Sequence, residues 1–172
     1  MYLWKKVVGL CGLLILTACG FHLKGTGNVQ YELPYSSWHV ENGQVMQNAL
    51  ESALIYQSSH VSLTENAEAV LKVIQIDHRQ DIQSYNNNGG VSEYLLWVRV
   101  HAQVFYQGEP VGKPIQVYAQ RVLTHNHSDL LGHQQEKQSV WQDIYQDAAK
   151  QMVQKLKTKR TAFPHASPEK SI

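Results

Sequence analysis

Hydrophobic and polar side chains alternate most regularly between Glu93 and Tyr106. Every even-numbered position from 94 to 106 carries an apolar or aromatic residue, and the odd-numbered positions are mostly polar or mixed. A period of two predicts a β-strand with one buried face. Further strands are predicted at Val70–Ile82 and Ile115–Thr124, which are rich in β-branched residues, and a short first strand at Tyr35–Val40. The alternation slips at Val73-Ile74, where a β-bulge would explain the slip.

Two other segments repeat their apolar residues every three to five positions, which is typical of amphipathic helices. The first helix is predicted to begin after Asn42, a good N-cap residue, and to end near Ser58. The second is predicted to span about Gln134–Lys159. Val61–Leu63 is predicted to be a short extended piece, and Gly108–Pro114 the loop of a hairpin. The apolar stripe of the second helix consists of Val140, Trp141, Ile144, Tyr145, Ala148, Met152, Val153 and Leu156.

The order strand, helix, three strands, helix indicates an α+β fold. Two amphipathic helices must both bury their stripes, so we expect them to cover the same face of the sheet. The sequence therefore predicts a two-layer α+β sandwich, with two helices on one face of a mostly antiparallel four-stranded sheet. We expect this domain at 35–160, after a tether at 19–34 and before a polar tail at 161–172 that we expect to be disordered.

The first 18 residues have the pattern of a secretory signal peptide. Lys5 and Lys6 precede the apolar run Val7–Thr17. This run has the length of an h-region and is too short for a membrane-spanning helix, which needs about 20 residues. It ends in Leu16-Thr17-Ala18-Cys19, which resembles the bacterial lipobox, where the cysteine thiol receives a diacylglyceryl group. We therefore expect cleavage before Cys19 and a membrane anchor through a lipid on its side chain.

Composition and short motifs narrow the function. Removing residues 1–18 leaves 154 of the 172 residues, with 13 basic (15 − 2) and 14 acidic ones, a net charge of −1. A nearly neutral chain argues against nucleic-acid binding, which depends on cations that neutralise phosphates. His125 and His127, with Asp129 nearby, lack further ligands at suitable spacing, so a solvated loop is favoured over a metal site and no cofactor is expected. The chain carries neither a nucleophile elbow nor a zinc-protease motif, which argues against an enzyme.

The stretch Cys19-Gly20-Phe21-His22-Leu23-Lys24-Gly25 resembles the start of the mature chain in the LptE family of lipoproteins. Further matches are Glu93-Tyr94 at the start of the long strand, and Tyr145–Ala149 leading to Leu156. The resemblance implies an outer-membrane lipoprotein on the periplasmic side, without enzymatic activity, that assembles with and plugs an LptD-type β-barrel and assists lipopolysaccharide insertion. The alternative is a generic periplasm-facing lipoprotein that binds another envelope protein, and a lipid-anchored hydrolase is a third reading.

The sheet face that the helices leave uncovered is the candidate partner surface. It is expected to carry Trp97, Arg99 and His101 from one strand and Tyr118 from the next. A tryptophan on a sheet face that no helix covers indicates a surface that a partner covers, because tryptophan is enriched at interfaces. Partial burial of these residues under the tail or a loop is an equally open interpretation.

The family resemblance also implies contact with lipopolysaccharide, through basic residues beside the second hairpin. Here the turn Tyr85–Gly90 has neither lysine nor arginine. The candidates that remain are the strand cations Lys72, Arg79 and Arg121. The lysines near the end of the last helix are a possible lipid contact too, although cations also suit a solvated helix C-terminus.

Overall fold

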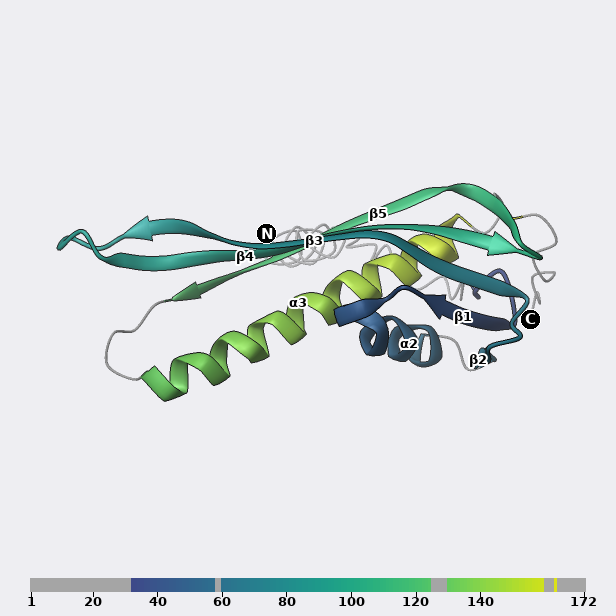
Figure 1. The fold of residues 1–172 in the computed structure, drawn as a ribbon, viewed down its shortest axis with the longest axis horizontal. Coiled ribbons are helices and arrows are strands. Elements are labelled where there is room, and N and C mark those ends of the chain that lie inside the picture. Colours follow the sequence, from purple (N-terminus) through teal and green to yellow (C-terminus); the bar gives the residue numbers. More distant parts are fainter. Residues whose placement is uncertain (1–31, 58–59, 125–129, 160–162, 164–172) are drawn as a thin grey trace, which may run out of the picture. The chain divides into compact units, whose positions relative to one another are not determined.

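A computed structural model describes residues 32–57, 60–124, 130–159 and Phe163 of the chain. All of them lie in one compact unit, Tyr31–Ile172. Cys19, the signal segment, the tether up to residue 31 and the histidine pair at 125 and 127 lie outside the described residues. The elements are β1 (Ser37–Glu41), a short 3₁₀ helix (Gln44–Met46), α2 (Gln47–Tyr56), β2 (Ser62–Leu63), β3 (Ala69–Tyr85), β4 (Val91–Tyr106), β5 (Glu109–Thr124) and α3 (Leu130–Thr158) (Figure 1).

The sheet has five strands in the order β2-β1-β3-β4-β5. β3, β4 and β5 are antiparallel neighbours, whereas β1 is parallel to both β2 and β3. The α+β prediction is confirmed, but the four-stranded count is wrong because Ser62–Leu63 joins the sheet as a fifth strand. The connection through α2 returns the chain to the same end of the sheet, which is why β2 runs parallel to β1.

The predicted bulge in β3 is present. The register shifts between Val73 and Gln75, and the side chain of Ile74 is 61% exposed. Before the bulge the helix-facing positions are odd-numbered, as at Leu71, and after it they are even-numbered, as at Ile76 opposite Val100. The extra residue therefore keeps the apolar side of this strand on the core across a break in its alternation.

The second hairpin differs from its prediction. β5 begins at Glu109, so the turn is only Gln107 and Gly108, both with positive φ (51° and 86°), as two-residue hairpin turns require. The expected loop at Gly108–Pro114 is instead strand with a bulge, because Val104 pairs with Val111 whereas Ala102 pairs with Ile115. Prolines and a glycine inside the strand hid it from sequence analysis.

The buried side chain of Gln103 holds this bulge. Its Nε2 donates to the carbonyl of Val111 at 2.7 Å and to that of Val104 at 3.0 Å, and the residue is 7% exposed. The ring of Phe163 comes within 3.0 Å of where a Cβ on Gly112 would lie. We expected the whole tail at 161–172 to be disordered. Phe163 is the one residue of this tail that the structure describes, and it is buried.

Both helices pack on one face of the sheet, as predicted, and lie beside each other (Figure 1). Asn42 does not cap helix α2; it has a positive φ of 60°, and the helix begins at Gln47. The side chain of Gln47 instead bonds the preceding segment, because its Oε1 accepts from the Gly43 N–H and its Nε2 donates to the Val40 carbonyl, both at 3.0 Å. The core under the helices includes Trp38, Leu50, Leu54, Leu71, Leu96, Val98, Val100, Ile115, Ile144, Met152 and Leu156.

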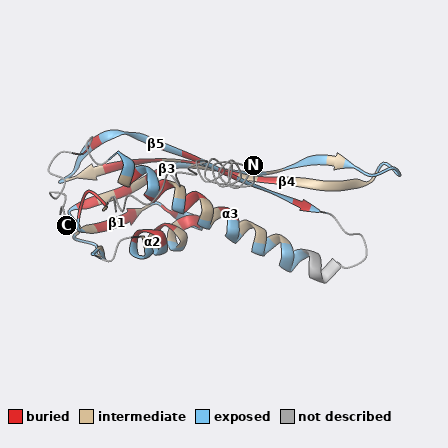
Figure 2. Ribbon diagram, turned by 180° about the vertical axis from the view of Figure 1, so that it is seen from behind, coloured by how far each residue is buried: buried red, intermediate tan, exposed pale blue. Residues whose placement is uncertain are grey.

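The apolar stripe of α3 is buried over only part of its length. The stripe residues from Ile144 onward are buried apart from Tyr145, which is half-buried like Val140 and Trp141. Helix α3 also begins four residues earlier than expected, at Leu130. Buried positions gather where α2 and α3 cover the sheet, and β3 and β4 continue beyond them as a largely exposed ribbon (Figure 2). Among the described residues, no helix is long and apolar enough to cross a membrane.

Candidate partner-binding surface

The sheet register brings three of the four predicted partner-binding residues into contact. Arg99 of β4 lies directly opposite Tyr118 of β5, and Trp97 is the next residue along β4 on this face. The ring centroids of Trp97 and Tyr118 are 5.9 Å apart, and Arg99 Cζ lies 5.4 Å from the first centroid and 6.0 Å from the second. We call Trp97, Arg99 and Tyr118 the outer-face cluster. His101 lies on the same face, opposite Gln116, outside these ring contacts.

Hydrogen bonds hold both rings of the outer-face cluster, one to the neighbouring strand β3 and one within β5. The indole N–H of Trp97 donates to Asp81 Oδ2 at 2.7 Å, and the hydroxyl of Tyr118 donates to Gln120 Oε1 at 2.8 Å. Trp97 is half-buried, and Tyr118 is 40% exposed. The cluster is therefore an ordered aromatic patch on the sheet face that the helices leave uncovered. Gln103, another odd-numbered residue of the same strand, is buried at the bulge.

The three cations expected to contact lipopolysaccharide do not form one group. Lys72 makes an ion pair with Glu41 at 2.8 Å, and Arg121 makes one with Asp147 of α3 at 3.2 Å. Arg121 lies on the helix-facing side of β5, opposite the buried Leu96, whereas Lys72 and Arg79 are on the outer face. Of the three, only Arg79 has no ion pair within the described part of the chain.

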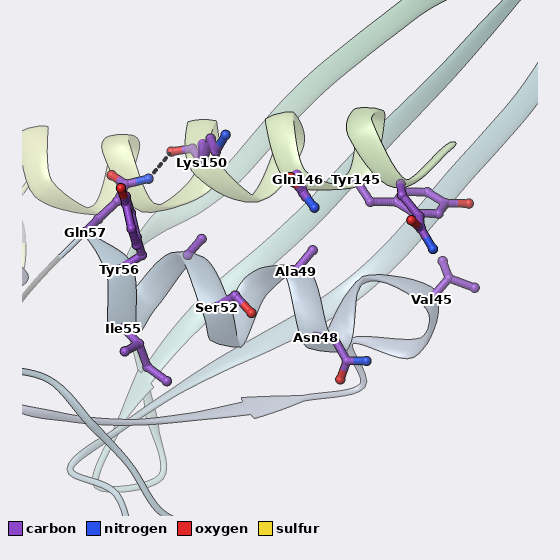
Figure 3. Close-up of a pocket in the computed structure, with 12 residues that line it drawn as sticks. Val45, Asn48, Ala49, Ser52, Ile55, Tyr56, Gln57, Tyr145, Gln146 and Lys150 are labelled. Carbon is purple, nitrogen blue, oxygen red and sulfur yellow. Dashed lines mark hydrogen bonds between the residues drawn. The ribbon is translucent and has the colours of Figure 1, made fainter. Parts of the chain in front are cut away.

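A second surface, missed in the sequence, is the groove between α2 and α3, which has a volume of about 850 Å³. Figure 3 shows Tyr56, Gln57 and Lys150 at one end of it, and Val45 and Tyr145 at the other. The Gln57 side chain donates to the Lys150 carbonyl at 3.4 Å. Val45 belongs to the apolar repeat that predicted the first helix, yet it is 56% exposed, and Tyr56 is 90% exposed. This segment has apolar residues on its exposed side as well as on its buried side, and the sequence pattern does not show which side faces the core.

Two titratable groups beside this groove have shifted pKa values. Burial raises the pKa of the Tyr145 hydroxyl. Burial lowers the pKa of the Lys157 ammonium, against the attraction of Glu32, which raises it. Lys157 donates to the carbonyl of Gln57 at the end of α2. This hydrogen bond ties the end of α2 to α3. The described residues contain no group of three or more histidine, cysteine, aspartate or glutamate side chains placed to hold a metal ion.

The sequence as a whole was compared with known proteins. The profile of the LptE family, described as lipopolysaccharide-assembly, matches residues 29–156. The chain belongs to the LptE family. It is 29% identical to the LPS-assembly lipoprotein LptE of Pectobacterium atrosepticum over 169 residues, which cover 91% of this chain and 85% of the relative. It is 26% identical to the LptE of Photorhabdus laumondii over 172 residues, covering 93% of this chain and 88% of the relative.

Solved structures share the fold of this LptE-family chain. A minor lipoprotein from Acinetobacter baumannii superposes with a TM-score of 0.62 at 20% identity, covering 79% of this chain and 99% of that one. An uncharacterized lipoprotein B from Nitrosomonas europaea gives a TM-score of 0.62 at 21% identity, covering 83% and 94%. The arrangement of helices and sheet described above is therefore found in other lipoproteins.

Proposed function

We propose that this LptE-family protein is a non-enzymatic outer-membrane lipoprotein, anchored through Cys19 on the periplasmic side, that assembles with an LptD-type β-barrel and occupies its lumen. In that position it assists the insertion of lipopolysaccharide into the outer leaflet. Lipopolysaccharide assembly is the role of its family. The barrel, the lumen and the anchor are the parts that the proposal adds.

The observation that carries the proposal is the outer-face cluster on a sheet face without helices. The interior of a membrane barrel is polar, unlike its lipid-facing outside, so a plug needs hydrogen-bonding groups with a few aromatic anchors. Interfaces concentrate their binding energy in tryptophan, tyrosine and arginine, the three residue types of this cluster. His101 extends the same face. We propose that Trp97, Arg99, His101 and Tyr118 contact the barrel wall.

Lipopolysaccharide contact is a separate part of the proposal. Lys72 and Arg121 would each have to give up an ion pair to bind a phosphate, whereas Arg79 would not. Because a paired cation must lose its partner before it can bind an anion, we retain all three as candidates but place Arg79 first. The test is crosslinking of a photoreactive residue at position 79 to lipopolysaccharide, with position 121 as the matched comparison.

The test of the proposed function is purification of the tagged full-length lipoprotein from detergent-solubilised membranes, with identification of its partners by mass. We expect a large outer-membrane β-barrel in near-equal amount. Trypsin treatment of the complex should leave the lipoprotein largely uncleaved, because the barrel would enclose it. Recovery of a different envelope protein without the barrel would favour the alternative of a generic lipoprotein. A barrel that binds only through its periplasmic part would contradict the luminal position.

A further inference from the structure

Arg99 carries a charge that nothing in the described part of the chain neutralises. Its cross-strand neighbour on β3 is Asp77, yet the carboxylate of Asp77 accepts from Gln75 Nε2, at 2.9 and 3.0 Å. The Arg99 guanidinium lies over the two rings of the outer-face cluster and makes no hydrogen bond or ion pair with any described residue. Its N–H groups therefore have no acceptor among the described residues of the chain.

The contrast with the neighbouring cations is informative. Lys72 and Arg121 are also exposed strand cations, and each has a carboxylate within 3.2 Å or less. The acids of β3 on this face have neutral partners instead, Gln75 for Asp77 and the indole of Trp97 for Asp81. Among the described residues, Arg99 and Arg79 are thus the outer-face arginines without an ion pair, and only Arg99 lies over the two rings.

The rings also prepare Arg99 for binding. Trp97 and Tyr118 are fixed by their own hydrogen bonds, and a guanidinium over aromatic faces is held by cation–π attraction. Arginine gains most from such a site because its planar fork is rigid and weakly hydrated. A side chain that is restrained beforehand loses less conformational freedom when it binds.

We propose that Arg99 is the docking point for a carboxylate of an aspartate or glutamate on the inner wall of the barrel; this inference rests on the proposed function above. A carboxylate is planar and matches the guanidinium fork in a bidentate pair. A lipid phosphate is better served by several converging cations. Here Lys72 and Arg121 are engaged elsewhere, and Arg79, the other outer-face arginine without an ion pair among the described residues, lies on β3 between Asp77 and Asp81. A protein carboxylate, which carries less charge than a phosphate, is therefore the ligand that the restrained Arg99 fits.

The first experiment is a competition inside the cell. Wild-type lipoprotein and a variant carrying a different tag are co-expressed at equal levels, and their ratio is measured on the purified barrel. Truncating one partner of a buried charge pair costs enough to lower affinity by about thirtyfold or more, so Arg99→Met and Arg99→Glu should be excluded by at least that factor. Arg99→Lys keeps the positive charge but loses the planar guanidinium, so its share on the purified barrel should lie between that of these two variants and that of wild type. Circular dichroism of each variant checks that it folds.

The second experiment identifies the ligand in the purified complex of the Arg99→Lys variant. A water-soluble carbodiimide activates a carboxylate, the lysine amine attacks it, and an amide forms while the reagent leaves as its urea. Mass spectrometry should find the lysine at position 99 joined to an aspartate or glutamate of the barrel. Lys72, which lies 2.8 Å from Glu41, supplies an internal positive control for the coupling.

The outcomes separate this inference from the proposed function. Exclusion of Arg99→Glu together with an amide bond to a barrel carboxylate supports it. Equal competition by Arg99→Glu, or coupling only to Asp77 within the same chain, overturns it while leaving the barrel partnership intact. If a photoreactive residue at position 99 couples to lipopolysaccharide and no amide to a barrel carboxylate forms, the ligand of Arg99 is a phosphate and the proposed protein carboxylate is wrong. If wild-type protein recovers no barrel at all, the proposed function fails, and this inference fails with it.

Discussion

The buried amide of Gln103 makes the most specific prediction about stability. Gln103→Met keeps a side chain of similar length but removes both donors from the carbonyls of Val111 and Val104, which they reach at 2.7 and 3.0 Å. A buried polar group that loses its partner costs about 1–3 kcal/mol, so two such losses should lower the free energy of unfolding by about 2–6 kcal/mol. That is a large fraction of the roughly 5–15 kcal/mol by which an ordinary domain is stable.

The assay for this prediction is urea unfolding followed by circular dichroism, with a thermal melt alongside. For a domain of this size, a loss of about 2–6 kcal/mol corresponds to a melting temperature lower by roughly 8–24 °C. Gln116→Met is the matched control, because Gln116 is an exposed glutamine of β5, and it should change stability by no more than about 0.5 kcal/mol. If Gln103→Met unfolds at the same urea concentration as the control, the amide does not hold the bulge, and the hairpin is stabilised by apolar packing alone.

Three further predictions concern the core, the anchor and pH. Val100 is fully buried, so Val100→Asp should place an unpaired charge in the core and leave the protein unfolded by circular dichroism; a wild-type melt would mean that the faces of β4 are reversed. Cys19→Ala should abolish lipid anchoring and leave soluble or unprocessed protein on membrane fractionation, whereas wild type with Gly20 after the cysteine should sediment with the outer membrane. Because burial raises the pKa of Tyr145 above its ordinary 10.0, the folded state holds this proton more tightly than the unfolded one. The stability that this hydroxyl contributes is thus fully present below pH 10 and is lost as pH rises through the folded pKa. The free energy of unfolding of Tyr145→Phe should therefore fall less than that of wild type at alkaline pH, and an equal fall in both proteins would show that Tyr145 does not cause it.

Strict alternation was the most informative feature of the sequence. In β4 it assigned the buried face correctly, because a period of two leaves little ambiguity over seven residues of each kind. It also located the bulge at Ile74. These are local properties of a single strand.

Pairing between strands was beyond the sequence. β2 has only two residues, too few for a pattern, and its parallel direction depends on how α2 returns the chain. The contact between Arg99 and Tyr118 depends on a register set by the turn at Gln107-Gly108, which was predicted as a longer loop. Sequence analysis therefore proposed the residues of the outer-face cluster, but the hydrogen bonds that order it, and the open guanidinium, required the sheet.

The partner surface is tested most directly by measuring barrel recovered per tagged lipoprotein for two double variants. Trp97→Ala/Arg99→Ala removes the outer-face cluster, and Ile55→Ala/Tyr56→Ala alters the groove side of the molecule to a similar extent. If the sheet face contacts the barrel, the first pair should reduce recovery by about tenfold or more, because loss of such anchors costs at least 2 kcal/mol. The second pair should leave recovery at the wild-type level, with both variants folded by circular dichroism. Normal recovery with the first pair and loss with the second would contradict the sheet face as the partner surface and assign that role to the helical groove.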